Sequence, residues 1–130
     1  MTPTERPLQG RTILLVEDEF LIQMDLQMQL EDAGATVLAA STVSEARACA
    51  DQVVDAAVLD VRLADGDIFP AADRLAERGI PIVFHSGHAD PRAMGHAYPG
   101  SITLSKPSAE GALPMALARL TPVRRASAAG

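Results

Sequence analysis

Residues 13–19 read Ile-Leu-Leu-Val-Glu-Asp-Glu, an apolar run that ends in three acidic residues. A short, continuous apolar run such as residues 12–16 is typical of a strand that is buried on both faces of a sheet. In open α/β sheets, the functional groups gather at the carboxyl ends of the parallel strands. The stretch therefore predicts a buried strand, with Glu17, Asp18 and Glu19 at the functional edge of the sheet.

The next segment, residues 20–33, has a pattern that would also suit a strand, because every second position from Ile22 to Leu30 is apolar. We nevertheless predict a helix. The segment is too long for an ordinary strand and is rich in Leu, Met, Gln and Glu, which favour helices. Gly34 stands where a C-terminal cap belongs. One face of this helix would carry Ile22, Leu26, Leu30 and Ala33.

Further strands and helices alternate along the rest of the chain. Apolar runs predict strands over residues 36–40, 56–59, 81–84 and 102–104. Helices are expected over residues 42–50, 69–78, 91–97 and from Ser108 to Leu120. Residues 62–67 contain Asp65-Gly66 and predict a loop. This alternation indicates an α/β fold, a doubly wound parallel sheet with helices on both faces.

Capping residues support two of these helices. Thr42, with Glu45 three residues later, is a capping-box signature. Ser108 is expected to cap the last helix, and Pro114 would then fall near its second turn, where proline bends or delays a helix. The domain should span residues 11–120, between a flexible extension at residues 1–10 and a disordered tail at residues 121–130.

Composition narrows the class of protein. Cys49 is the single cysteine, so no internal disulfide can form and a reducing, cytoplasmic location is expected. No apolar run approaches the roughly 20 residues of a membrane span, and residues 1–10 do not form a signal peptide. The net charge of −6 and an aromatic content of 3% disfavour binding to nucleic acid.

Chemically complementary side chains stand at four predicted strand ends. Asp60, Ser86 and Lys106 each lie at a strand end, as Asp18 does, so a parallel sheet would bring them together. Taken singly, each could be a helix cap, a turn former or a solvated surface residue. Together they suggest a site, because two adjacent carboxylates attract a cation and oxygen ligands suit Mg²⁺. A hard dication beside a carboxylate and a lysine suits phosphoryl transfer.

Four motifs carry a resemblance to a known family. Residues 13–19, 58–63 (Val-Leu-Asp-Val-Arg-Leu), 84–88 (Phe-His-Ser-Gly-His) and 105–107 (Ser-Lys-Pro) resemble bacterial two-component response regulator receiver domains. The resemblance covers about residues 11–120. It implies a flavodoxin-like (βα)5 fold with strand order 2-1-3-4-5 and a stand-alone receiver domain without a DNA-binding domain.

The resemblance also implies roles for individual residues. Asp60 would accept a phosphoryl group from a sensor histidine kinase. Asp18 and Asp60 would bind Mg²⁺ directly, together with the backbone carbonyl of Arg62, and Glu17 would act through a metal-bound water. Such a domain is not a classical enzyme, although it assists its own phosphorylation and dephosphorylation.

Further roles concern the phosphoryl group itself. Lys106 and the Ser86 hydroxyl would each hold a phosphoryl oxygen, and the Lys106–Pro107 bond would be cis. The side chains of Arg62 and His88 would border the phosphoryl group and modulate its hydrolysis, although both could equally be ordinary exposed loop residues.

The chain departs from the family pattern in the loop at residues 61–67, which lacks the usual Met-Pro or Leu-Pro, and at two further positions. Thr103 stands where receivers carry an aromatic switch residue, so Thr103 would modulate switching differently, and Tyr98 lies five residues earlier. Ser108 stands where a hydrophobic residue usually follows Lys-Pro.

Several alternatives remain open at this point. The output partner would be a phosphotransfer protein or another regulated protein, and a homodimer is compatible with the sequence. A pseudo-receiver would serve as an adaptor without phosphorylation. A flavin carrier or a small phosphatase would need different residues after the first strand. The histidines of the chain could hold zinc, the spacing of His85 and His88 being the best suited.

Overall fold

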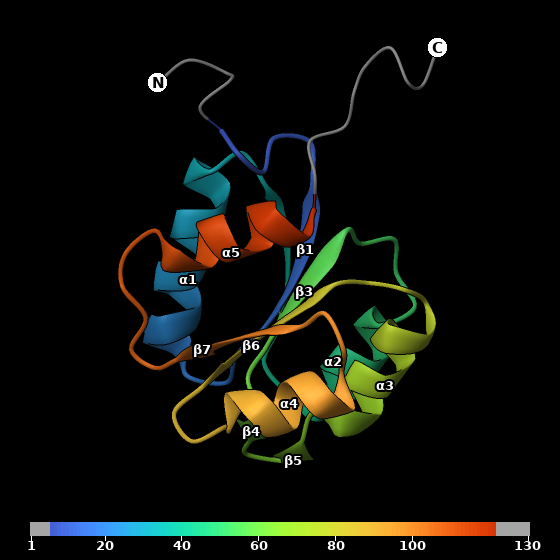
Figure 1. Cartoon of the computed structure of the whole chain (residues 1–130). Helices are drawn as coiled ribbons and strands as arrows, with labels where there is room; N and C mark the ends of the chain where they lie inside the picture. The colour runs from blue at the N-terminus through green and yellow to red at the C-terminus, as the bar shows by residue number, and fades with distance from the viewer. Residues whose placement is uncertain (1–5, 122–130) are drawn as a thin grey trace.

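The computed structural model describes residues 6–121, and its centre is a five-stranded parallel sheet (Figure 1). The strands are β1 (Thr12–Val16), β2 (Thr36–Ala40), β3 (Ala56–Leu59), β6 (Ile82–Ser86) and β7 (Ile102–Ser105). Their spatial order is β2-β1-β3-β6-β7. This order corresponds to 2-1-3-4-5 among the strands of the main sheet, and the predicted flavodoxin-like topology is confirmed.

Helices cover both faces of the sheet, as Figure 1 shows. One face is covered by α1 (Phe20–Asp32) and α5 (Ala112–Leu120), and the other by α2 (Val43–Cys49), α3 (Phe69–Glu77) and α4 (Pro91–Ala97). Among residues 6–121, every helix is too short or too polar to cross a bilayer. The predicted doubly wound α/β architecture is therefore confirmed.

Strand β1 supplies side chains to both halves of the core. Ile13 and Leu15 pack in the cluster beneath α1 and α5, whereas Leu14 and Val16 pack in the cluster beneath α2, α3 and α4. Successive side chains of a strand point to opposite faces, so a strand covered on both faces must be apolar throughout. This requirement explains the continuous apolar run at residues 12–16.

Helix α1 accounts for the strand-like alternation of its sequence. Its inner face carries the predicted apolar residues, of which Leu26 and Leu30 are fully buried. A second apolar stripe lies on the outer surface, because residues three, four or seven positions apart share a helical face. This exposed stripe consists of Phe20, Leu21, Met24 and Met28, whose exposed fractions lie between 46% and 74%. Two apolar stripes on opposite sides of one helix produce the alternation.

The segment that we expected to be a loop forms a small hairpin instead. Strands β4 (Arg62–Leu63) and β5 (Gly66–Asp67) pair antiparallel around a two-residue turn. The buried side chain of Leu63 anchors the hairpin, and Asp65 Oδ1 accepts a hydrogen bond of 2.9 Å from the Val43 N–H at the start of α2. Period-2 patterning cannot reveal strands of two residues.

The last helix begins later than predicted. It starts at Ala112, with Gly111 as its N-cap, and not after Ser108. Pro114 therefore lies in the first turn, where its missing N–H costs nothing, whereas a start at residue 109 would have placed it in the helix interior. The expected Ser108 cap was wrong, because the hydroxyl of Ser108 contacts His85.

Residues 6–10, expected to belong to a flexible extension, form a turn that is packed against the domain. Leu8 is completely buried, and its N–H donates a 2.9 Å hydrogen bond to the carbonyl of Ala33. At the other end, Thr121 is also buried, and its hydroxyl donates to the carbonyl of Leu117. The remainder of the expected extension and tail, residues 1–5 and 122–130, lies outside the described residues.

Substituting Gly34 should destabilise the fold. Gly34 has a φ of +101°, and a Cβ there would stand 2.8 Å from Cα of Gln9. We expect Gly34→Ala to lower the free energy of unfolding by about 1–3 kcal/mol, measured by urea denaturation. Gly95→Ala is the matched control, because a Cβ there meets nothing within 4 Å and alanine favours helix α4. Equal effects of the two substitutions would contradict this assignment.

Candidate functional site

Three carboxylates meet at the carboxyl ends of β1 and β3. Glu17 and Asp18 follow β1 directly, and Asp60 follows β3. One oxygen atom from each carboxylate lies within 4.8 Å of the others. Glu17 is only 1% exposed and Asp60 6%. The sheet thus brings together acidic residues that follow two of the predicted strands.

Lys106 bridges the two buried carboxylates. Its Nζ lies 2.7 Å from Oε1 of Glu17 and 2.9 Å from Oδ2 of Asp60, and its side chain is 19% exposed. Lys106 is the only lysine of the chain. A single ammonium therefore offsets part of the repulsion between two carboxylates that water screens poorly.

The pKa values of this cluster reflect burial and pairing. Burial raises the pKa of Glu17, and the repulsion from Asp60 adds to this effect, although contact with Lys106 opposes it. Burial alone would lower the pKa of Lys106, but the interactions with Glu17 and Asp60 outweigh it and raise that pKa. The ammonium of Lys106 is therefore held in its charged form.

Backbone N–H groups orient all three carboxylates. Asp18 Oδ2 accepts a 2.8 Å hydrogen bond from the N–H of Ala64, in the turn of the β4–β5 hairpin. Asp60 Oδ1 accepts from the N–H of Arg62 at 3.3 Å, and Glu17 Oε2 accepts from the N–H of Glu19 at 3.1 Å. Sequence reasoning missed the contact of Ala64 because the hairpin itself was not predicted.

The donor set fits a hard divalent cation. Carboxylate and carbonyl oxygens are the ligands that Mg²⁺ prefers in proteins. Three carboxylates paired with one lysine leave net negative charge at the cluster, which a dication would compensate. Glu17, Asp18 and Asp60 are the one group of three or more His, Cys, Asp or Glu residues within residues 6–121 whose atoms are close enough to hold a metal.

Ser86 ends strand β6 next to the position from which Lys106 leaves β7. The carbonyl of Ser86 accepts a 3.0 Å hydrogen bond from the N–H of Lys106. The Ser86 hydroxyl accepts from the N–H of His88 at 3.3 Å. The Lys106–Pro107 bond is cis, as expected. Ser86 therefore lies at the same edge of the sheet as the carboxylates, with its hydroxyl engaged within its own turn.

The three residues that we expected to modulate the site have different surroundings. The side chains of Arg62 and His88 are exposed. Thr103 is half-buried in β7 and pairs in register with Phe84 of β6. All three stay predictions as modulators.

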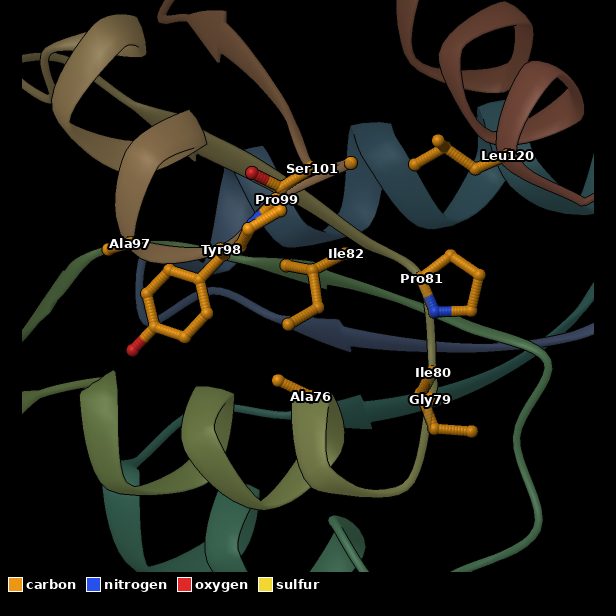
Figure 2. Close-up of a pocket in the computed structure, with 11 residues that line it drawn as sticks. Ala76, Gly79, Ile80, Pro81, Ile82, Ala97, Tyr98, Pro99, Ser101 and Leu120 are labelled. Atoms are coloured by element: carbon orange, nitrogen blue, oxygen red, sulfur yellow. The ribbon is translucent and has the colours of Figure 1, made fainter.

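Tyr98 lies at the end of α4, and its ring points toward α3 (Figure 2). The ring stacks on Phe69 at a centroid distance of 6.3 Å and packs at 5.2 Å against Phe84. Its hydroxyl donates a 2.6 Å hydrogen bond to Asp73. Tyr98 also lines the cavity of about 390 Å³ shown in Figure 2, whose lining includes none of the acidic cluster or Lys106.

The zinc hypothesis for the histidines is wrong for the described residues. His88 and His96 are exposed, whereas His85 is 3% exposed. The Nε2 of His85 lies 3.0 Å from Oγ of Ser108. Burial, followed by the nearby charge of Lys106, lowers the pKa of His85, so the ring is held in its neutral form.

Comparison with known proteins gives consistent matches. The family model of the response regulator receiver domain matches residues 13–118. The crystal structure of a response regulator receiver protein from Sinorhizobium medicae WSM419 is 32% identical, with a TM-score of 0.80, and the alignment covers 91% of this chain and 99% of that one. No curated protein sequence matches the chain.

Two further solved structures are similar. The non-phosphorylated HemR receiver domain of Leptospira biflexa is 29% identical, with a TM-score of 0.77 and coverage of 89% of this chain and 98% of that one. The receiver domain of the sensor histidine kinase PA1611 from Pseudomonas aeruginosa PAO1 is 26% identical, with a TM-score of 0.75 and coverage of 88% and 99%. That structure has a magnesium ion in its active site cleft.

Removing the bridging ammonium should destabilise the fold in a pH-dependent way. Lys106→Met leaves Glu17 and Asp60 facing each other, so we expect a loss of about 1.5–3 kcal/mol in the free energy of unfolding near neutral pH. The raised pKa of Glu17 means that the folded state binds a proton more tightly than the unfolded chain, so falling pH stabilises the folded state. Without Lys106 the pKa of Glu17 in the folded state should be higher still, so acidification should stabilise the variant more than the wild type.

The deficit of Lys106→Met should therefore shrink between about pH 7 and about pH 5 in denaturant titrations. Arg119→Met serves as the control, because Arg119 is an exposed base of α5. A deficit that stays constant over this pH range would argue against a charge-based origin.

Proposed function

The chain belongs to the response regulator receiver domain family, and from this premise we propose that it is a phosphoryl-accepting switch of a two-component system, with Asp60 as the acceptor. The observation that carries the proposal is the position of Asp60, which is buried, oriented by the N–H of Arg62 and paired with the only lysine. Receiver domains interact with histidine kinases and other proteins, so the phosphoryl donor would be a sensor histidine kinase.

The acidic cluster would hold Mg²⁺. Asp18 and Asp60 would be direct ligands, with the backbone carbonyl of Arg62 as a third, and Glu17 would act through a bound water. The similar receiver domain from Pseudomonas aeruginosa, with magnesium in its active site cleft, supports this assignment. When bound, the ion would neutralise negative charge on the transferring group.

Asp60, Lys106 and Ser86 would together carry out the transfer of the phosphoryl group. A carboxylate oxygen of Asp60 attacks the phosphorus of a phosphohistidine, forming a P–O bond as the P–N bond breaks, and the nitrogen keeps the electron pair of the broken bond. Lys106 exchanges its contact with Asp60 for one phosphoryl oxygen. The Ser86 hydroxyl leaves the His88 N–H and donates to another. Both side chains already stand at the carboxyl edge of the sheet that carries Asp60.

Other residues would set the lifetime and the readout of the phosphorylated state. We place the side chains of Arg62 and His88 beside the phosphoryl group, where they modulate hydrolysis. Thr103 occupies the position at which receivers usually carry an aromatic switch residue. The signal would therefore be transmitted without the reorientation of an aromatic side chain of β7. The output would be a contact with a phosphotransfer protein, another regulated protein or a second copy of the chain.

The exposed stripe on α1 suits the docking of the kinase. Phe20 and Leu21 begin the helix, two residues beyond Asp18, so the stripe starts beside the acceptor site. Exposed apolar residues gathered on one helical face are characteristic of protein interaction sites. A partner that covers this stripe would lie next to Asp60.

The pseudo-receiver alternative is less compatible with the site. Burying Glu17 and Asp60 together raises the free energy of the folded state unless the charges are compensated. An adaptor that is never phosphorylated has no use for this arrangement, because apolar residues would stabilise the same edge of the sheet better.

Direct phosphorylation distinguishes the two readings. With acetyl phosphate and Mg²⁺, we expect the mass of the intact protein to rise by one phosphoryl group, and Asp60→Asn to abolish the increase. Chelating the divalent cation should also prevent it. Asp73→Asn is the control, because Asp73 carries its carboxylate on α3 beside Tyr98. An unmodified wild-type protein under these conditions would support the adaptor.

The docking surface can be tested separately from the chemistry. Met24→Gln should lower kcat/KM for phosphotransfer from a histidine kinase by about 5- to 30-fold, the range for a central interface residue. Its rate of phosphorylation by acetyl phosphate should stay unchanged. Val53→Gln is the matched control, since Val53 is 89% exposed and lies outside the stripe. If Met24→Gln slows both reactions equally, the stripe is not the docking surface.

A further inference from the structure

His85 is a buried polar residue whose presence needs a reason. It lies in β6 directly before Ser86, and only 3% of it is exposed. One ring nitrogen, Nε2, lies 3.0 Å from Oγ of Ser108. The other, Nδ1, is buried and has no hydrogen-bond partner among residues 6–121. A buried nitrogen without a partner destabilises the fold, so an apolar ring would pack better at this position.

Ser108 belongs to the segment that carries Lys106. Strand β7 ends at Ser105, and α5 begins at Ala112, so residues 106–111 lie in neither element. At the far end of the segment, the Gly111 N–H donates a 3.3 Å hydrogen bond to Oε1 of Gln29 in α1. The segment is joined to β6 at two points. The first is the 3.0 Å backbone hydrogen bond from the Lys106 N–H to the Ser86 carbonyl, and the second is the contact between Ser108 and His85.

Packing alone holds this segment weakly. A groove of about 530 Å³ lies between α1 and the segment, and its lining includes His85, Lys106, Pro107 and Ser108. Pro107 is exposed, and Ser108 is half-buried. On the side of the groove, few side chains pack against the segment. A single hydrogen bond should therefore do more to fix the position of the segment here than it would in the close-packed core.

We propose that His85 is a positioning residue, whose hydrogen bond to Ser108 holds the segment that places the Lys106 ammonium at Asp60. His85 does not touch the reacting atoms. It acts through Ser108 on the backbone two residues beyond Lys106. The effect on transfer rests on the proposed function, whereas the effect on the order of the segment does not.

Three variants separate positioning from a packing role. His85→Phe keeps a buried ring and removes the nitrogen that has no partner, so we expect an unchanged or higher Tm. Ser108→Ala removes only the hydroxyl, and the double variant removes both partners. Ser101→Ala is the matched control, since the Ser101 hydroxyl is buried, makes no hydrogen bond within the described residues and lines the cavity of Figure 2 before β7 begins.

Two measurements apply to each variant. The first is amide hydrogen exchange of Lys106, with Leu14 and Val58 in the central strands as internal references. The second is the rate constant for phosphorylation by acetyl phosphate with Mg²⁺. We expect both single variants to accelerate exchange at Lys106 alone and to slow phosphorylation by about three- to tenfold, the range that one hydrogen bond controls.

The double variant decides whether the two residues act through one bond. We expect it to be no slower than either single variant, because both substitutions remove the same contact. Multiplicative effects of the two substitutions, or exchange at Lys106 that matches the wild type in His85→Phe, would overturn the inference. If the wild type accepts no phosphoryl group, the proposed function fails, and the exchange measurements alone still decide whether His85 orders the segment.

Discussion

The contact of one ammonium with two buried carboxylates is the interaction on which the carboxyl edge of the sheet depends. Glu17 and Asp60 come from neighbouring strands, and the parallel sheet forces them together at its carboxyl edge. Lys106 reaches them from the edge strand β7, so the whole width of the sheet between β1 and β7 contributes to a single charge cluster. The segment after β7 must therefore be held in place, which gives His85 and Ser108 their significance.

The same cluster explains why the surrounding loops are ordered. Backbone N–H groups of Glu19, Arg62 and Ala64 each donate to one carboxylate. The β4–β5 hairpin thus contributes to the site through its backbone, and it is tied to α2 by Asp65. The conformation of these turns is therefore coupled directly to the positions of the three carboxylates.

Much of the fold and of the site could be predicted from the sequence. The geometry of parallel sheets requires apolar strands and brings the residues after them to one edge, so the sequence alone indicates Asp18, Asp60 and Lys106. Helix α1 was assigned correctly from length and composition, although its alternation favoured a strand. The hairpin, the late start of α5 and the pairing of His85 with Ser108 were not predictable, because each depends on contacts between segments distant in the chain.

That the chain has a single lysine also restricts the chemistry that can be used to study it. Reagents that modify primary amines, including the common succinimide ester cross-linkers, would find their only side-chain target at Lys106. Acylation there would remove the positive charge between Glu17 and Asp60. Capturing a binding partner with such reagents would therefore disable the site whose complexes are sought, and photoreactive groups introduced at Cys49 would be the safer route.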